Sequence, residues 1–225
     1  MGLRVAIDLD GTVADLSQAM LGVATKYFGE ARTATPSTGP AAPAPSDRPT
    51  LQDFGLRPSE LDALWTEVLR TKNFWTTLVE TEPGIVARIA ALATDRRWDV
   101  LFITTRPTAL GETTQVQSQK WLHAHGFEHP SVYVVKGSRG LVATALALDA
   151  VVDDRPENCL DVATDSPAQA VLVWPGPLEA LGPGVTRHGV VVTRSIDAAL
   201  DQLVEMDRAR RGGVVQSLKR LLRRH

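Results

Sequence analysis

The sequence predicts an α/β protein in which a parallel sheet is flanked by helices, and three observations support this fold class. Short apolar runs alternate with helical patterns along most of the chain. The first apolar run ends in two aspartates and a Gly-Thr turn. The chain has 225 residues, 44% hydrophobic and 22% charged, which suits one domain of ordinary size with a modest insertion. The net charge of −2 provides no overall field that favours nucleic acid.

The individual elements follow from the pattern of apolar residues. Apolar runs bounded by turn residues predict buried strands, and longer amphipathic stretches predict helices. Strands that alternate with such helices are typical of a parallel sheet covered on both faces. The predicted strands are residues 3–9, 99–104, 131–135, 150–152, 170–174 and 189–192. The predicted helices between them are residues 85–94, 113–125, 141–148, 156–163 and 196–206.

Residues 15–82 interrupt this alternation. They contain two helical patterns, residues 16–28 and 58–69, on either side of a stretch with five prolines. That composition cannot bury a core, so we expect an exposed loop at about residues 33–49. We interpret the block as a small helical cap inserted after the first strand, and residues 1–14 and 83–207 as the core. A proline-rich ligand for a partner is the alternative, although no clean P-x-x-P with basic neighbours is present.

The C-terminal residues 208–225 form a separate pattern, in which seven basic residues accompany five aliphatic ones. This pattern predicts a short basic amphipathic helix. It would either dock on the core through its leucines or make a weak contact with an anionic surface such as lipid or nucleic acid.

The remaining bulk features favour a cytoplasmic protein. Residues 1–4 lead directly into the first predicted strand, so no signal peptide is expected. No apolar run approaches the ~20 residues of a membrane span. Cys159 is the single cysteine, which excludes an intrachain disulfide and is expected to be a small core residue.

The most specific part of the sequence follows the first predicted strand. If the strand stays extended, Asp8 and Asp10 project in the same direction from its carboxyl end, and Gly11 lets the chain turn away. Two unit charges ~4 Å apart repel by roughly 4 kcal/mol at an effective dielectric of ~20. Such a pair is tolerated when a cation lies between the carboxylates or when one of them carries out chemistry.

Three further predicted strands end in polar residues. Hydroxyls of Thr104 and Thr105 follow the second strand, Lys136 follows the third, and the pair Asp153 and Asp154 follows the fourth. In open α/β sheets, ligands bind outside the carboxyl ends of the strands. Hydroxyls there can hold a phosphate oxygen, and a lysine beside clustered carboxylates can hold phosphate as a point charge.

Four crowded carboxylates need positive charge, and oxygen-only ligands point to a hard cation. Phosphate chemistry favours Mg²⁺, which keeps several waters and binds through few carboxylates. Zinc is not expected, because His123 and His125 are two residues apart and do not share a helical face.

The string from Asp8 to Asp15, D-x-D-G-T-x-x-D, resembles the first motif of the haloacid-dehalogenase-like phosphohydrolases. The order Asp-x-Asp, Thr, Lys, Asp-Asp matches all four motifs of that superfamily, which implies its Rossmann-like core. The resemblance implies that Asp8 is the nucleophile that forms an aspartyl-phosphate, and that Asp10 is the general acid and base. It implies that Thr104 binds the phosphoryl group, with Thr105 as the alternative if the end of the strand is misplaced.

The same resemblance assigns the charged residues. Lys136 would neutralise Asp8 and the phosphate. Asp153, together with Asp8 and the carbonyl of Asp10, would hold Mg²⁺, and Asp154 would support this site.

A closer resemblance is to the 5′(3′)-deoxyribonucleotidases and covers roughly residues 3 to 160. It rests on Lys72-Asn73-Phe74-Trp75, Pro83-Gly84, Trp121 and Asp153-Asp154-Arg155-Pro156. In that family the cap supplies aromatic side chains to the base, which implies that Phe74 and Trp75 bind substrate by stacking. Arg106, at a position where the nearest relatives carry another residue, is counted with these substrate-binding residues.

One departure concerns Leu16, since the family has an aromatic residue there and leucine cannot stack. The sequence therefore predicts a Mg²⁺-dependent phosphatase of (deoxy)nucleoside monophosphates. Two alternatives stay open: a phosphatase for another small phosphate ester such as a sugar phosphate, and a non-catalytic binding module that keeps the fold.

Overall fold

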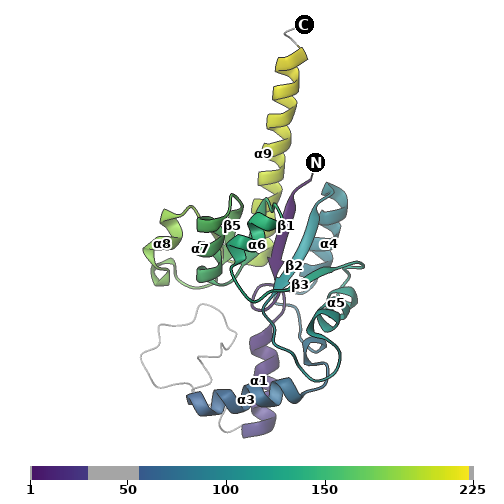
Figure 1. Ribbon diagram of the computed structural model, residues 1–225, viewed down its shortest axis with the longest axis vertical. Helices are drawn as coiled ribbons and strands as arrows, with labels where there is room; N and C mark the ends of the chain where they lie inside the picture. The colour runs from purple at the N-terminus through teal and green to yellow at the C-terminus, as the bar shows by residue number, and fades with distance from the viewer. Residues whose placement is uncertain (1, 30–55, 223–225) are drawn as a thin grey trace.

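The computed structural model of the chain describes residues 2–29 and 56–222 (Figure 1). The predicted proline-rich loop at residues 33–49 lies outside the described residues. The sheet has six parallel strands in the order β3-β2-β1-β4-β5-β6. This architecture confirms the predicted fold class. The strands are β1 (Arg4–Asp8), β2 (Asp99–Thr104), β3 (Ser131–Val134), β4 (Ala150–Asp153), β5 (Gln169–Val173) and β6 (Val191–Thr193).

Helices cover both faces of the sheet, because successive strand side chains point to opposite sides. Val5 and Ile7 of β1 belong to a core that includes α4, α5 and α9, whereas Ala6 belongs to a second core with α6, α7 and α8. Both faces are therefore buried, which explains the nearly continuous apolar strands. The helices of this layer are α4 (Ile85–Arg96), α5 (Thr114–Ala124), α6 (Arg139–Ala145), α7 (Pro156–Asp165), α8 (Pro183–Arg187) and α9 (Ile196–Leu222).

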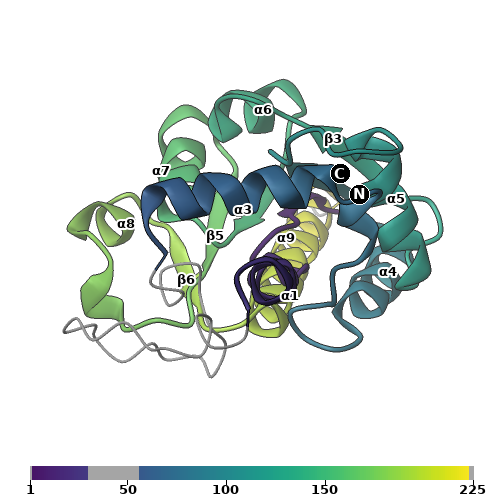
Figure 2. The same cartoon turned by 90° about the horizontal axis from the view of Figure 1, so that it is seen from below.

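Two helices lie outside the carboxyl edge of the sheet, α1 (Leu16–Phe28) and α3 (Pro58–Arg70) (Figure 1). Seen from that side, α3 crosses the molecule and α1 is viewed along its axis (Figure 2). The carboxylate of Asp15 accepts a hydrogen bond from the backbone of Gln18 at 2.9 Å and starts α1 directly after the β1 turn. A 3₁₀ turn, η2 (Phe74–Thr76), leads from α3 back to the core.

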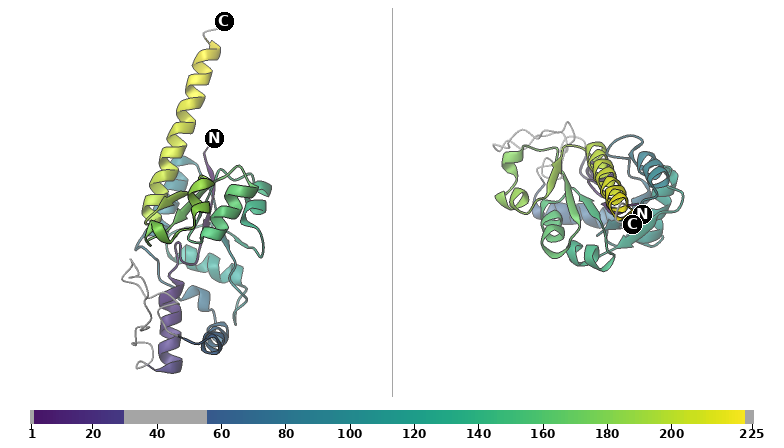
Figure 3. Two further views of the ribbon diagram at one scale, coloured as in Figure 1. Left: turned by 90° about the vertical axis from the view of Figure 1, so that its left-hand side faces the viewer. Right: turned by 90° about the horizontal axis from the view of Figure 1, so that it is seen from above.

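The predicted last helix and basic tail are one continuous helix. α9 runs over 27 residues and extends beyond the sheet on the side away from α1 and α3 (Figure 3). Near its middle, α9 is held to α4 by an ion pair of 3.1 Å between Arg96 and the fully buried Asp207. In the described part of the chain, no helix is long and apolar enough to cross a membrane. Cys159 is buried, and burial raises the pKa of its thiol, as expected for a core residue.

Candidate active site

The four predicted carboxylates meet at the carboxyl ends of β1 and β4. These strands are hydrogen-bonded neighbours, and Asp8 and Asp153 are their last residues. Asp10 lies in a tight turn closed by a bond of 2.8 Å from the backbone of Ala14 to the carbonyl of Leu9. Gly11 has a φ of 85°, and a Cβ placed on it would lie 2.1 Å from Oδ2 of Asp154. The positive φ favours glycine here, and a larger residue would displace the carboxylate of Asp154.

Burial raises the pKa of three of these acids, Asp8, Asp153 and Asp154. Burial is the main cause that raises the pKa of Asp8 well above its usual range, and Asp153 and Asp154 raise it further, while Arg139 lowers it. The pKa of Asp154 is raised to about 7 by burial and by the charge of Asp153. Burial and mutual repulsion thus disfavour the ionised form of the cluster, and a bound cation would stabilise that form.

One buried guanidinium lies between Asp8 and Asp153. Nη2 of Arg139 donates to Oδ1 of Asp8 at 3.0 Å, and its Nε lies 3.7 Å from Oδ2 of Asp153. The Arg139 side chain is only 2% exposed. In the part of the chain that the structure describes, its Nε and Nη1 have no hydrogen-bond partner. Buried donors without a partner are costly, so this guanidinium is suited to an anion that binds beside Asp8.

Arg139 reaches the carboxylates because α6 packs tightly against α7. A Cβ on Gly140 would lie 2.3 Å from the carbonyl oxygen of Asp161, so only glycine fits between the two helices. Ser138 caps α6 by accepting a bond from the backbone of Leu141 at 3.0 Å. These contacts place the first residue of α6 against the end of the sheet.

The sequence predicted that Lys136 would be the cation that neutralises Asp8. The structure places Lys136 two residues after β3, with an exposed side chain and no ion pair to any described residue. Arg139, which no sequence motif singled out, contacts the carboxylates instead. The position of Arg139 as the first residue of α6 was a usable signal. The helix dipole disfavours a cation in the first turn of a helix, so such a cation indicates acidic groups nearby.

Asp153 is held in one orientation by the start of α7. The side chain of Asn158 donates to both of its carboxylate oxygens, at 3.0 and 2.9 Å, and the backbone of Arg155 donates to Oδ1 at 2.9 Å. Asp154 is half-buried, and its Oδ1 lies 3.4 Å from the hydroxyl of Thr12.

Thr104, the last residue of β2, and Thr105, which follows it, face different ways. Asp8 pairs with Ile103, and the alternation of side chains, continued by one residue, places Thr105 on the same face as Asp8. Thr105 is exposed. Thr104 is 1% exposed, and its hydroxyl accepts from the backbone of Arg106 at 3.2 Å and lies 3.4 Å from Oδ2 of Asp10. Thr104 is thus part of the internal support of the site, whereas the hydroxyl of Thr105 is open to a ligand.

Arg106 is also a support and not an open binding group. Its guanidinium holds the carboxylate of Asp10, with Nη2 2.7 Å from Oδ1. The predicted base-binding residues Phe74 and Trp75 are 1% and 0% exposed, and the indole of Trp75 donates to the carbonyl of Pro107 at 3.1 Å. In this arrangement both rings are core residues and neither is open to a nucleobase.

The donor set fits Mg²⁺ and not zinc. Among the described residues, no group of three or more His, Cys, Asp and Glu side chains is arranged to hold a metal ion. Mg²⁺ needs fewer, since it binds through one or two carboxylates and keeps its waters. Asp8 and Asp153 are the carboxylates that would hold such an ion, beside the guanidinium of Arg139. The ring nitrogens of His123 and His125 lie within hydrogen-bond distance of backbone carbonyls, at 3.2 and 2.7 Å.

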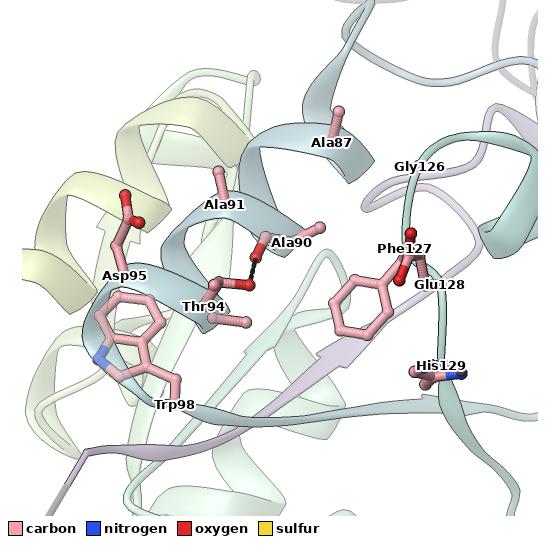
Figure 4. Close-up of a pocket in the computed structure, with 11 residues that line it drawn as sticks. Ala87, Ala90, Ala91, Thr94, Asp95, Trp98, Gly126, Phe127, Glu128 and His129 are labelled. Atoms are coloured by element: carbon pink, nitrogen blue, oxygen red, sulfur yellow. Dashed lines mark hydrogen bonds between the residues drawn. The ribbon is translucent and has the colours of Figure 1, made fainter.

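A separate cavity of about 690 Å³ lies near the amino ends of β2 and β3, at the end of the sheet opposite to the carboxylates (Figure 4). It is bounded by Trp98, which precedes β2, and by residues 126–129, which precede β3. Alanines of α4 form one wall, and Phe127 points toward them from the other side (Figure 4). The cavity is therefore remote from the carboxylates, and its polar lining residues are Thr94, Asp95, Glu128 and His129.

Comparison with solved structures identifies the fold. A hydrolase of the haloacid-dehalogenase-like family from Streptococcus pneumoniae superposes with a TM-score of 0.50 at 14% identity, covering 89% of this chain and 97% of that chain. A predicted phosphatase from Clostridium acetobutylicum superposes with a TM-score of 0.50 at 13% identity, covering 91% and 99%. The chain has the haloacid-dehalogenase-like fold. No family model matches its sequence. No curated protein matches it either.

Proposed function

We propose that the chain is a Mg²⁺-dependent phosphomonoesterase that works through an aspartyl-phosphate on Asp8. The observation that carries this proposal is the buried guanidinium of Arg139, which contacts Asp8 and whose Nε and Nη1 have no hydrogen-bond partner among the described residues. Beside a nucleophilic carboxylate, buried donors without a hydrogen bond suit the oxygens of a phosphoryl group. The haloacid-dehalogenase-like fold agrees with this chemistry, since it places the acids at the edge where ligands bind in open α/β sheets.

The first half-reaction transfers the phosphoryl group to the protein. A carboxylate oxygen of Asp8 attacks phosphorus, the ester P–O bond breaks, and Asp10 gives its proton to the leaving oxygen. In the second half-reaction, Asp10 takes a proton from a water that attacks phosphorus, which releases phosphate and restores Asp8. Mg²⁺, held by Asp8, Asp153 and the Asp10 carbonyl and supported by Asp154, would neutralise charge on the transferred group.

Two further residues bind the phosphoryl oxygens in this proposal. Arg139 takes the charge-neutralising role that the motif order assigned to Lys136, because it lies 3.0 Å from Asp8. Thr105 donates its hydroxyl, because it is exposed and shares a strand face with Asp8. Thr104 instead supports the segment after β2, because its hydroxyl accepts from the backbone of Arg106.

The proposed substrates are (deoxy)nucleoside monophosphates, on the resemblance of residues 72–75 and 153–156 to the deoxyribonucleotidases. A base-free ester such as a sugar phosphate is the second candidate. The burial of Phe74 and Trp75 favours it, because neither ring is available for stacking on a base.

A substrate panel tests both levels of the proposal. Phosphate release is measured from deoxy- and ribonucleoside monophosphates and from sugar phosphates, with Mg²⁺ or with EDTA, for the wild type and Asp8→Asn. Release that needs Mg²⁺ and disappears in Asp8→Asn supports the mechanism. A fall in kcat/KM when the base is removed supports nucleotides, and equal turnover of base-free esters contradicts them. No release from any ester contradicts the enzyme proposal and leaves the binding module.

A further inference from the structure

Asp10 is held by an arginine that the proposed mechanism does not use. Nε of Arg106 lies 3.0 and 2.9 Å from the two carboxylate oxygens of Asp10, and Nη2 lies 2.7 Å from Oδ1. The Arg106 side chain is completely buried, whereas that of Asp10 is 17% exposed. This two-nitrogen contact fixes both the position and the plane of the carboxylate, because a guanidinium is a rigid planar donor.

The guanidinium is itself fixed from two other directions. Its Nη1 donates to the hydroxyl of Ser118 in α5 at 2.9 Å, and Ser118 is fully buried. Its carbon lies 4.9 Å from the ring centroid of Trp75. The ring of Trp75 cannot shift easily, because its indole nitrogen donates to Pro107 and its backbone nitrogen donates to Gln117 at 3.1 Å. Three segments of the chain thus determine where Arg106 lies.

We propose that Arg106 is a positioning residue that holds Asp10 in the orientation from which it protonates the leaving oxygen. The proposal rests on the proposed function. Arg106 neither forms a bond to substrate nor transfers a proton. The ester P–O bond breaks, the bond from Asp8 to phosphorus forms, and the proton moves from Asp10 to the departing oxygen. Since Trp75 belongs to the segment that joins α3 to the core, the orientation of Asp10 is tied to the cap junction.

The test is the dependence of kcat/KM on the leaving group. With Mg²⁺ present, kcat/KM is measured for an alkyl phosphate, phenyl phosphate and 4-nitrophenyl phosphate, because the poorer leaving groups need a proton and nitrophenolate does not. We expect Arg106→Met to lose about 100-fold on the alkyl ester and less than about 10-fold on the nitrophenyl ester, within the range of general acid catalysis. Arg106→Lys should be intermediate, because an ammonium cannot hold the plane of the carboxylate.

Two controls separate positioning from a structural role. Arg96→Met removes an arginine from another buried aspartate, Asp207, near the middle of α9. It should lower the melting temperature and leave the leaving-group dependence unchanged. Asp10→Asn should show the same steep dependence as Arg106→Met, and the double variant should lose little more than Asp10→Asn alone.

Several outcomes overturn the proposal. An equal loss of kcat/KM on all three esters would show a general structural role for Arg106. A higher KM with unchanged kcat would show that Arg106 binds the substrate phosphate. If Arg106→Met does not fold, Ser118→Ala removes only one support and should give the same pattern at about 3-fold, as expected for one hydrogen bond. A wild-type protein that hydrolyses none of the esters overturns the proposed function itself.

Discussion

Two buried arginines contact the carboxylates at the edge of the sheet, and they differ in what each leaves free. Each side-chain nitrogen of Arg106 has a partner, in Asp10 or in Ser118. Arg139 has a hydrogen bond on Nη2 alone within the described part of the chain, and its Nε and Nη1 are buried without one. A satisfied guanidinium is part of the framework, whereas an unsatisfied one is ready for a ligand.

The difference follows from the two faces of the sheet. Asp8, Asp153 and Arg139 lie on the face covered by α6 and α7, where like charges crowd together. Asp10 and Arg106 lie toward α5 and η2, where Trp75 and Ser118 complete the contacts. We therefore expect substitutions on the first side to affect phosphoryl binding, and substitutions on the second side to affect proton transfer.

The largest effect is expected from Asp8→Asn. Loss of the nucleophile should lower kcat by about 10⁴-fold or more. The same variant should melt at a higher temperature, because burial raises the pKa of Asp8 and its charged form is costly in the folded state. Phosphate release and thermal melting on one preparation measure both. A variant that loses activity and also melts lower would contradict this account of the cluster.

The next effect sharpens the comparison of the two arginines. Arg139→Met should lower kcat/KM by about 100-fold or more on every leaving group, since it removes a donor to the phosphoryl oxygens. It should also weaken inorganic phosphate binding by about 10-fold or more, as one charge-assisted hydrogen bond is lost. Arg106→Met is the matched control and should bind phosphate like the wild type. Inhibition of turnover by phosphate measures both, and equal weakening in the two variants would remove the distinction.

A smaller effect is expected at the strand-end threonines. Thr105→Ala should lower kcat/KM by about 10-fold, the loss of one hydrogen bond to a charged group. Thr104→Ala should cost stability more than turnover, because its hydroxyl is buried against the backbone of Arg106. Steady-state kinetics and urea unfolding of the two variants measure these losses. A larger loss of kcat/KM in Thr104→Ala would show that Thr104 is the phosphate-binding residue.

The smallest effect concerns pH. Folding raises the pKa of Asp154 from 3.8 to about 7, so the folded state binds its proton more tightly than the unfolded state. Without Mg²⁺, the free energy of unfolding should therefore fall by about 2 kcal/mol as pH rises from 5 to 7, and then level off. Urea unfolding in EDTA measures this slope, which Asp154→Asn should reduce and added Mg²⁺ should offset. A slope of the opposite sign would show that the acids are already neutralised by the protein.

Much of the framework could be predicted because it depends on local patterns. The predicted helix 16–28 has the observed bounds, and the strand 99–104 is also found as predicted. Apolar runs specify buried strands wherever the fold covers both faces of a sheet. The predicted helix 196–206 was too short, because α9 continues to Leu222 through Gly212 and Gly213, and no proline interrupts it.

The sequence by itself determined the parallel fold and the two acidic pairs at its edge, because strand ends and the Gly11 turn are encoded within a few residues. Only the tertiary structure decided which cation serves which acid. Lys136 and Arg139 are three residues apart, and the close packing of α6 on α7 selects the second. Likewise, Phe74 and Trp75 are large apolar rings in either role, and only the packing of η2 against α5 places them in the core. Such choices depend on contacts between segments far apart in the chain.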